Sequence, residues 1–291
     1  MYRQGMPCLN TKQTMLYNFH THSHYDDGKE PLEAYVVAAI EKGLSALGFS
    51  GHQPLPFDNE WSLHPSALPE YLAEARRLKE QYKNEINIYI GLEMDYIPGH
   101  SEDFAALMKD AGLDYCIGSV HLVMKPGSTN RDHIWFIDGP REGYFHGIQE
   151  IFNGNVRAAV EAYYEQQRQM VLTQKPHIIG HLDKVNMHNR GELFKTTEAW
   201  YQEAINHLLA AIQKTGTIVE ANTRGVYTGK TTDVFPAVDI LEKCHAHRIK
   251  VMVNTDAHHP QQLDQHFEET KTLLKRLGFS KTVTPFFESP L

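Results

Sequence analysis

Two pairs of potential metal ligands stand near opposite ends of the sequence. His20-Thr-His22 ends one β-rich apolar stretch, and Asp256-Ala-His258 follows the apolar run 251–255. Side chains at positions i and i+2 of an extended chain point to the same side, so each pair can bind one ion. Imidazole and carboxylate together suit a first-row divalent metal. The two pairs therefore indicate a metal site at the ends of strands.

Other apolar stretches also end in residues that can bind metals or anions. Glu93 follows the apolar stretch 89–92, where a carboxylate must be paired, bound to a metal or near solvent. Asp27, in contrast, lies in a turn-like segment and by itself needs no function. Any one of these residues could be an ordinary hydrogen-bonded polar group, but seven successive strand ends favour one shared centre. In chain order the strand-end residues are His20 with His22, His52, Glu93, His121, His181, Glu220 with Arg224, and Asp256 with His258.

The segments that must position these residues alternate between strand and helix. Repeated β-then-α order implies a parallel sheet, and seven such units in under 300 residues favour a closed barrel. The stretch 123–155 is less regular, and we expect an inserted loop region with one short helix there. No G-x-G-x-x-G or Walker A sequence follows the first strand, which weakens a nucleotide-binding alternative. The expected strands are 15–20, 44–49, 86–92, 113–118, 177–181, 217–222 and 250–255, and the expected helices are 31–42, 66–83, 100–109, 155–173, 197–214, 235–246 and 261–276.

The composition excludes several classes of protein. A formal net charge of −8 argues against nucleic-acid binding, which needs clustered lysine and arginine. Cys8, Cys116 and Cys244 are widely spaced and form no C-x-x-C pair, so we expect neither a disulfide framework nor a thiolate zinc site. No apolar run approaches the roughly 20 residues of a membrane span, and the polar start lacks a signal peptide. We therefore expect a cytoplasmic protein with no membrane partner, consisting of a single domain over residues 1–291.

The motifs in this order resemble the PHP (polymerase and histidinol phosphatase) superfamily of metal-dependent phosphoesterases. The resemblance spans residues 20–258 and implies a distorted (β/α)7 TIM-like barrel with a trinuclear metal centre. The matching motifs are His20-Thr-His22 with Asp27, Gly51-His52, Gly91-Leu-Glu93, Gly118-Ser-Val-His121, Gly180-His181-Leu-Asp183 and Thr255-Asp256-Ala-His258.

The resemblance also implies how the metal ligands are divided among three divalent ions. One ion would be bound by His20, His22, Glu93 and Asp256, and a second, bridged by Glu93, by His121 and His181; the third would be bound by Asp27, His52 and His258. Nitrogen and oxygen ligands without sulfur favour zinc, manganese or iron.

Within the superfamily the chain looks most like the histidinol-phosphate phosphatase branch. That similarity implies hydrolysis of L-histidinol phosphate in histidine biosynthesis. One departure is Gly51, where relatives commonly place an acidic residue, and it puts the orientation of His52 in question. The supporting stretches are Gly48-Phe-Ser-Gly-His52-Gln-Pro-Leu-Pro, Ser119-Val-His-Leu, Trp135-Phe-Ile-Asp138-Gly and Glu220-Ala-Asn-Thr-Arg224-Gly.

Phosphate ester hydrolysis needs a strong nucleophile and charge neutralisation, and clustered divalent ions supply both. Our hypothesis is that two ions share a hydroxide that attacks phosphorus in line. Arg224 is the first candidate for a phosphate clamp and Lys184 the second. Besides the bridging Glu93, the proposed catalytic residues are Asp256 and His258, either of which could protonate the leaving group. Candidates for contacts with the organic part, none of them assigned, are Asp58, Glu60, Trp61, Trp135 and Asp138.

Other functions also fit the motifs. The nearest is a phosphoesterase of the same superfamily acting on another small phosphate ester, a nucleotide or a phosphotyrosine peptide. A metal-binding barrel without catalysis is a second, although the complete set of ligands disfavours it. A hydrolase of the amidohydrolase kind is a third, but there a lysine would bridge the metals in place of Glu93. The sequence leaves the oligomeric state open.

Overall fold

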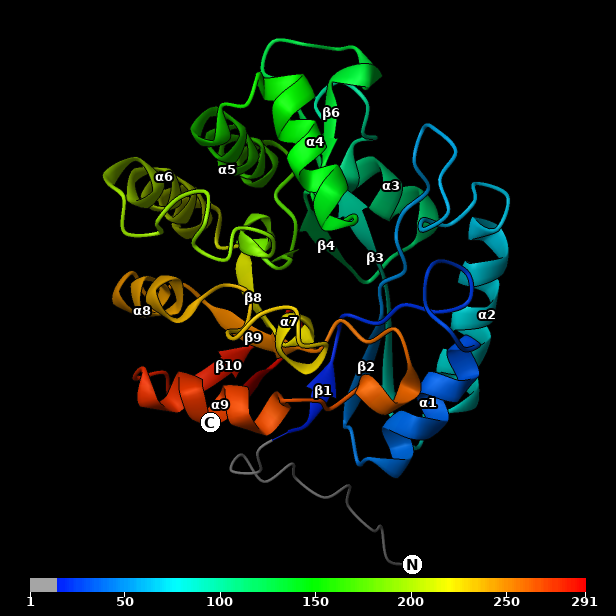
Figure 1. Cartoon of the computed structure of the whole chain (residues 1–291). Coiled ribbons are helices and arrows are strands. Elements are labelled where there is room, and N and C mark those ends of the chain that lie inside the picture. The colour runs from blue at the N-terminus through cyan, green and yellow to red at the C-terminus, as the bar shows by residue number, and fades with distance from the viewer. Residues whose placement is uncertain (1–14) are drawn as a thin grey trace, which may run out of the picture.

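Seven parallel strands form the centre of the fold in the computed structural model, which describes residues 15–291 (Figure 1). Each strand overlaps one of the seven expected from the sequence, and together with the surrounding helices they form the expected distorted (β/α)7 barrel. In the order in which they pair, the strands are β1 (Tyr17–Asn18), β2 (Ala46–Phe49), β3 (Asn87–Asp95), β4 (Tyr115–Ser119), β7 (Ile178–Ile179), β8 (Ile218–Asn222) and β9 (Val251–Asn254).

The barrel is closed between β9 and β1 by asparagine side chains and one isolated bridge. The bridge joins Thr21 to Ala257, just beyond the ends of the two strands. The side chain of Asn254 accepts a hydrogen bond from the backbone N–H of Phe19 at 2.9 Å. In return, the side chain of Asn18 accepts one from the N–H of Thr255 at 2.9 Å. Side chains thus supply the backbone partners that a regular ladder would have provided.

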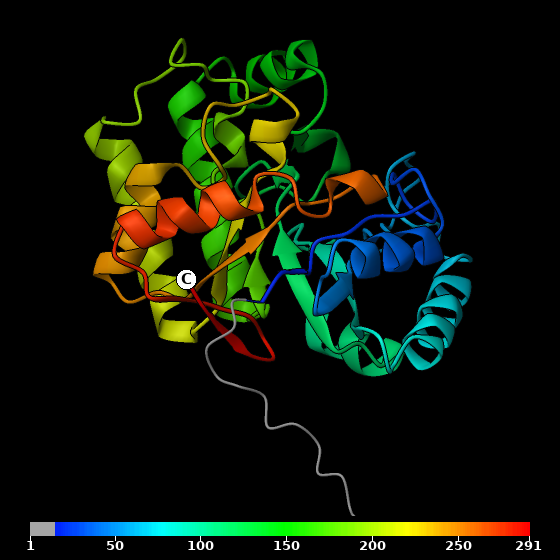
Figure 2. The same ribbon diagram turned by 90° about the horizontal axis from the view of Figure 1, so that it is seen from below.

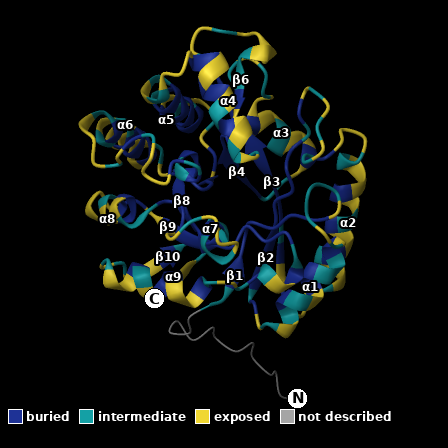
Figure 3. Ribbon diagram, viewed as in Figure 1, coloured by how far each residue is buried: buried dark blue, intermediate teal, exposed yellow. Residues whose placement is uncertain are grey.

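Helices surround the barrel, with their buried faces toward the strands and their exposed faces outward (Figures 1 and 3). All seven expected helices are present, although α3 and α9 begin later than expected. The side chain of Asp103 caps α3 by accepting from the N–H of Ala106, and a 3-10 turn, η3 (Pro260–Gln262), precedes α9. These helices are α1 (Leu32–Glu41), α2 (Leu68–Gln81), α3 (Phe104–Ala111), α5 (Val156–Thr173), α6 (Ala199–Thr215), α8 (Val238–Ala246) and α9 (Phe267–Arg276).

The expectation of an inserted loop region over 123–155 was wrong, although the one expected helix is present and longer than expected. This region forms an antiparallel hairpin and a helix of three turns. Trp135, a buried residue of the hairpin, packs so closely on the helix that a Cβ at Gly147 would lie 2.2 Å from its ring. Its indole N–H also donates to the carbonyl of Tyr144. The elements are β5 (Leu122–Met124), η1 (Arg131–His133), β6 (Ile134–Phe136) and α4 (Arg141–Phe152).

The end of the barrel at which the strands begin is covered by a C-terminal hairpin, β10 (Lys281–Val283) and β11 (Glu288–Pro290), seen toward the bottom of Figure 2. Phe286 in its turn stacks on Tyr89 with ring centroids 3.8 Å apart. The other end of the barrel, where the strands terminate, carries two further short elements that the sequence did not indicate, η2 (Lys184–Asn186) and α7 (Arg224–Tyr227).

Two further expectations concern membranes and cysteines. Within residues 15–291, no helix is long and apolar enough to cross a membrane. Cys116 and Cys244 are buried free thiols, whereas Cys8 lies outside the described residues.

We predict that Asn254→Ala destabilises the protein, because it leaves the buried N–H of Phe19 without its acceptor. The side chain of Asn254 also donates to Glu220, which loses this partner too. We expect the free energy of unfolding, measured by urea denaturation, to fall by about 1–3 kcal/mol. The control is Asn206→Ala, which removes an exposed asparagine bonded to Lys243 and should change stability by less than about 0.5 kcal/mol. Equal stability of the two variants would contradict the view that Asn254 helps to close the barrel between β9 and β1.

Candidate metal centre

Glu93 lies at the middle of a buried cluster formed where the strands end. Its side chain is 1% exposed, and both carboxylate oxygens face imidazole nitrogens. Five of the six predicted histidine ligands lie within 4 Å of it. The nitrogen–oxygen distances are 3.0 Å from His20 Nε2, 3.4 Å from His22 Nε2, 3.2 Å from His52 Nδ1, 3.7 Å from His121 Nε2 and 2.9 Å from His181 Nε2.

The remaining predicted ligands complete the same cluster. His258 Nε2 lies 3.0 Å from Asp27 Oδ2, and Asp27 Oδ1 lies 4.0 Å from His52 Nε2. Asp256 Oδ1 lies 3.4 Å from both His22 Nε2 and His258 Nδ1. The structure thus brings together all nine residues that the sequence indicated as metal ligands, although Asp27 alone had offered little reason for a function.

The donor atoms of this cluster are arranged as metal ligands are. Four overlapping sets each place their ligand atoms within 4.8 Å of one another. Four inward-facing atoms, His22 Nε2, Asp27 Oδ1, His52 Nδ1 and Asp256 Oδ1, are buried without a hydrogen-bond partner. Buried polar atoms normally have partners, so the residues fit divalent metal ions. Because the sets share residues, the division of ligands among three ions stays a prediction. The sets are His22, Asp27, His52 and His258; His20, His181 and Asp256; His20, His22 and Glu93; and His52, Glu93 and His121.

The charges in the cluster also favour cations. Burial by itself would raise the pKa of Glu93, but the surrounding imidazoles, among them His20 and His121, outweigh it and hold the pKa well below its usual range. Burial lowers the pKa of His52 to about 4 and also lowers the pKa of His181. For three other rings the neighbouring carboxylates outweigh burial and raise the pKa: His20, His121 and His22, the last to about 10. Without metal some of the imidazoles therefore carry protons, and divalent ions would displace these protons on binding.

Three carboxylates that the sequence analysis did not assign hold three of the histidines from outside the cluster. Each carboxylate accepts a hydrogen bond from the Nδ1–H of its histidine, so each ring carries a proton on Nδ1 and presents Nε2 to the cluster. The partners are Glu220 for His20 at 2.6 Å, Asp26 for His22 at 2.6 Å, and Asp95 for His121 at 3.0 Å.

Two of these carboxylates carried a detectable signal in the sequence. Asp95 stands two residues after Glu93 on the same strand, so both side chains point the same way. Glu220 interrupts the apolar strand β8 and is fully buried. A buried charge of this kind requires a partner, and His20 provides it.

Asp26 answers the question raised by Gly51. Its Oδ2 accepts a hydrogen bond from the backbone N–H of His52 at 3.1 Å while it also holds His22. A Cβ at position 51 would lie 3.4 Å from that same carboxylate oxygen and 3.0 Å from Leu63. The carboxylate of Asp26 thus lies directly beside position 51, so the acidic group next to His52 comes from another loop.

The two predicted anion-binding residues both lie at the cluster. Lys184 Nζ is 3.5 Å from His121 Nε2 and 2.8 Å from Asp138. Burial opposes its charge, but Asp138 outweighs burial, and the pKa of Lys184 is raised. Arg224 donates to the backbone carbonyl of Asp256 at 3.0 Å. Both cations therefore stand beside candidate ligands, where an anionic substrate would meet them.

Asp256 is held in an unusual backbone conformation. Its φ is +53°, in the left-handed region that non-glycine residues rarely adopt. The carbonyl accepts hydrogen bonds from Arg224, from the hydroxyl of Tyr227 at 3.0 Å and from His258 Nδ1 at 3.1 Å. These three donors offset the strain and keep the carboxylate directed into the cluster.

The residues considered for the organic part of a substrate do not all lie at this face. Trp135 is fully buried between the hairpin and α4, so it cannot contact a ligand. Asp58 and Glu60 are exposed, and neither has an ion-pair partner in the described part of the chain. Trp61 and Asp138 remain beside the cluster.

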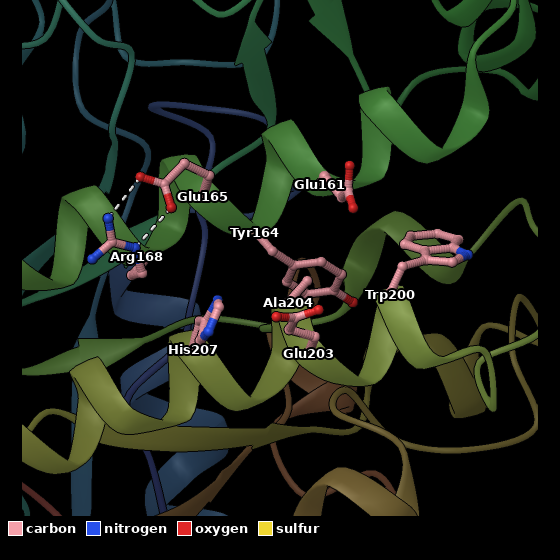
Figure 4. A pocket seen from close by; sticks show the side chains of 8 residues that line it. All are labelled: Glu161, Tyr164, Glu165, Arg168, Trp200, Glu203, Ala204 and His207. Carbon is pink, nitrogen blue, oxygen red and sulfur yellow. Dashed lines mark hydrogen bonds and ion pairs between the residues drawn. The ribbon is translucent and has the colours of Figure 1, made fainter.

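A separate pocket of about 320 Å³ lies between α5 and α6, outside the barrel (Figure 4). Trp200, Glu161 and Glu203 line it, and Glu165 pairs there with Arg168. It contains none of the predicted site residues and does not bear on the metal centre.

Comparison with known proteins assigns the family. The model of the PHP domain matches residues 18–224, which is more than half of the chain. The chain belongs to the PHP domain family. This PHP protein is 28% identical over 279 residues to the "Probable histidinol-phosphatase" of Schizosaccharomyces pombe, covering 89% of this chain and 87% of the relative.

Solved structures show the same fold. The chain is similar to the crystal structure of hisK from Listeria monocytogenes, with a TM-score of 0.76 and 22% identity over 87% of this chain and 99% of that one. It is also similar to histidinol phosphate phosphatase from Lactococcus lactis in complex with zinc, L-histidinol and phosphate, with a TM-score of 0.64 and 23% identity. That match covers 95% of this chain and 98% of the Lactococcus chain.

We predict that Glu93→Gln lowers the number of bound metal ions by at least one per chain. An amide has about the size of the carboxylate but lacks the charge that faces five histidines. Elemental analysis of protein saturated with zinc or manganese and then desalted measures the loss. The control is Glu192→Gln at an exposed glutamate paired with Arg141, which should keep the full metal content. Full metal content in Glu93→Gln would argue against a bridging role.

Proposed function

We propose that this protein hydrolyses L-histidinol phosphate to L-histidinol and phosphate with three divalent ions held by the nine cluster residues. The observation that carries the proposal is the buried cluster of imidazoles and carboxylates with four unpartnered inward-facing donors, flanked by two cations. Membership in the PHP family and the similarity to the Schizosaccharomyces protein support the choice of reaction. The zinc, L-histidinol and phosphate in the Lactococcus structure support the choice of metal class and substrate.

Divalent ions bound in the cluster would lower the pKa of water and neutralise the charge of the phosphate. The chain itself supplies the two cations that orient the phosphate. Lys184 is a compact point charge, whereas the planar guanidinium of Arg224 can hold two phosphate oxygens at once. Nη1 of Arg224 donates to the Asp256 carbonyl and to the hydroxyl of Tyr227, which leaves Nε and Nη2 to hold the substrate.

Asp256 is the better placed of the two candidate proton donors. Both nitrogens of His258 are committed, Nδ1 to the Asp256 carbonyl and Nε2 to the metal cluster beside Asp27. Asp256 has two oxygens, of which Oδ1 faces the cluster and Oδ2 contacts only the amide of Asn222 at 3.2 Å. Burial by itself would raise the pKa of Asp256, but His20 and Arg224 outweigh burial and hold it well below its usual range, so Asp256 is an ionised ligand. It can carry a proton only in transit, from the attacking water to the departing alkoxide.

The nearest alternative is a phosphatase of the same family with another small phosphate ester, a nucleotide or a phosphotyrosine peptide as substrate. The binding partner we propose is a small-molecule phosphate monoester and not a nucleic acid. The metal centre is the same in both cases, so only the substrate separates the two proposals.

We predict that purified protein loaded with zinc, manganese or iron releases phosphate from L-histidinol phosphate with kcat/KM at least about tenfold above that for p-nitrophenyl phosphate. A chelator should abolish the release and added metal should restore it. Inorganic phosphate is measured over a panel that includes nucleotides and a phosphotyrosine peptide. A higher kcat/KM for one of those esters would mean that this ester, and not L-histidinol phosphate, is the substrate. Activity that survives complete metal removal would overturn the mechanism.

We also predict that Arg224→Ala lowers kcat/KM by about 10- to 100-fold and weakens inhibition by inorganic phosphate. The matched control is Tyr227→Phe, which removes another donor to the Asp256 carbonyl and a 3.4 Å acceptor of Arg224, but no charge. If Arg224 contacts phosphate, only its own variant should weaken phosphate inhibition. Equal effects of the two variants would mean that Arg224 merely supports Asp256.

A further inference from the structure

One wall of the metal centre is aromatic and faces solvent. Trp61, from the segment after β2, packs edge-on against His52 with ring centroids 4.8 Å apart. Its ring is nearly parallel to that of Phe136 at the end of β6, with an angle of 11° and centroids 6.0 Å apart. Phe136 is 37% exposed, one of the few large hydrophobic side chains left in solvent among residues 15–291.

This wall does not belong to the main core. Leu55, Ile97, Leu122 and Met124 form a small separate hydrophobic cluster beneath it, on which Trp61 packs. This small cluster supports Trp61 beside the metal ligands, while the main core holds the rest of the hairpin through Val123 and Trp135. Trp61 and Phe136 thus form a partly exposed aromatic pair at the edge of the metal centre.

A carboxylate and an ammonium group stand next to this wall. Asp138 follows Phe136 by two residues, and its Oδ2 lies 2.8 Å from Lys184 Nζ. The side chain of Lys184 is 8% exposed and that of Asp138 is 27% exposed. The cation is therefore the inner partner, directed toward His121, and the anion is the outer one.

We propose that Asp138 binds the ammonium group of the substrate and that Trp61 and Phe136 bind its imidazole ring. This inference rests on the proposed function. In histidinol phosphate the ammonium and the phosphate are on neighbouring carbon positions, so their charges lie roughly 3–5 Å apart. Lys184 and Asp138 present the opposite charges side by side, 2.8 Å apart, Lys184 to the phosphate and Asp138 to the ammonium.

The surroundings of Asp138 favour the aromatic side for the ring. On the other side a pocket of about 330 Å³ is lined by Arg190 and Lys230, whose charges would repel an imidazolium. The face of an aromatic ring instead attracts a cation and also stacks on a neutral imidazole.

Four substrates separate the contacts. They are L-histidinol phosphate, 2-aminoethyl phosphate with an amine but no ring, the des-amino analogue of histidinol phosphate with a ring but no amine, and p-nitrophenyl phosphate. We expect Asp138→Asn to lower kcat/KM by about 10- to 100-fold for the two amine-bearing esters only. We expect Phe136→Ala to lower it by about 3- to 30-fold for the two imidazole-bearing esters only.

The controls exclude indirect effects. Asp132→Asn removes an equal charge from η1, in the same hairpin region, and should change no substrate preference. Trp61 stays unchanged because it contacts His52. Metal content of each variant is checked by elemental analysis, and binding of L-histidinol by calorimetry should weaken in Asp138→Asn without a change in the affinity for inorganic phosphate.

Failure of this inference differs from failure of the proposed function. If the unmodified protein prefers histidinol phosphate but Asp138→Asn lowers kcat/KM equally for all four esters, Asp138 acts only through Lys184 and the inference is overturned. If Phe136→Ala keeps the same preference for the imidazole-bearing esters as the unmodified protein, the proposed contact between Phe136 and the imidazole ring is refuted. If the unmodified protein shows no preference for histidinol phosphate, the proposed function itself fails.

Discussion

The burial of Glu93 among histidines is the constraint on which the rest of the structure depends. A carboxylate that is 1% exposed would cost several kcal/mol if it were left without partners. His52 and His121 follow the strands next to β3, but His20, His22 and His181 follow strands two places away and reach Glu93 only because the sheet curves. The seam between β1 and β9 therefore serves the metal centre directly. There, Asn254 bonds both to the first strand and to Glu220, the residue that holds His20.

A second layer of carboxylates, outside the cluster, fixes the imidazoles of the first. Asp26, Asp95 and Glu220 hold three imidazoles from outside, so the cluster contains six carboxylates when Glu93, Asp27 and Asp256 are included. Lys184 and Arg224 offset only part of that charge. Protons on the histidines can balance some of the remainder, and divalent ions can displace those protons. Stability and metal binding should therefore be coupled in this protein.

The positions of most ligands follow from local sequence patterns, which is why the sequence could predict them. Strand ends are found by apolar periodicity, and Asp95 could have been added because it stands two residues beyond Glu93 on the same strand. Asp26 could not, since its role depends on how its loop folds against the backbone N–H of His52 in another loop. The region 123–155 was misjudged because its glycine and proline residues are typical of loops, whereas tertiary packing holds it as a hairpin and a helix.

That misjudged region separates the two tasks of the molecule. The ligands stand at the ends of barrel strands, where parallel pairing fixes their positions and the chemistry depends on exact placement. The β5–β6 hairpin lies outside the barrel sheet and contributes no ligand, yet it places Phe136 and Asp138 at the entrance. The hairpin backbone is tied to a ligand, since the N–H of Ile137 donates to the carbonyl of His121. On the proposed function, however, changes in the side chains of Phe136 and Asp138 would alter which alcohol is accepted while the ligands keep their places. Substrate preference can therefore diverge between members of the family while the metal centre stays the same.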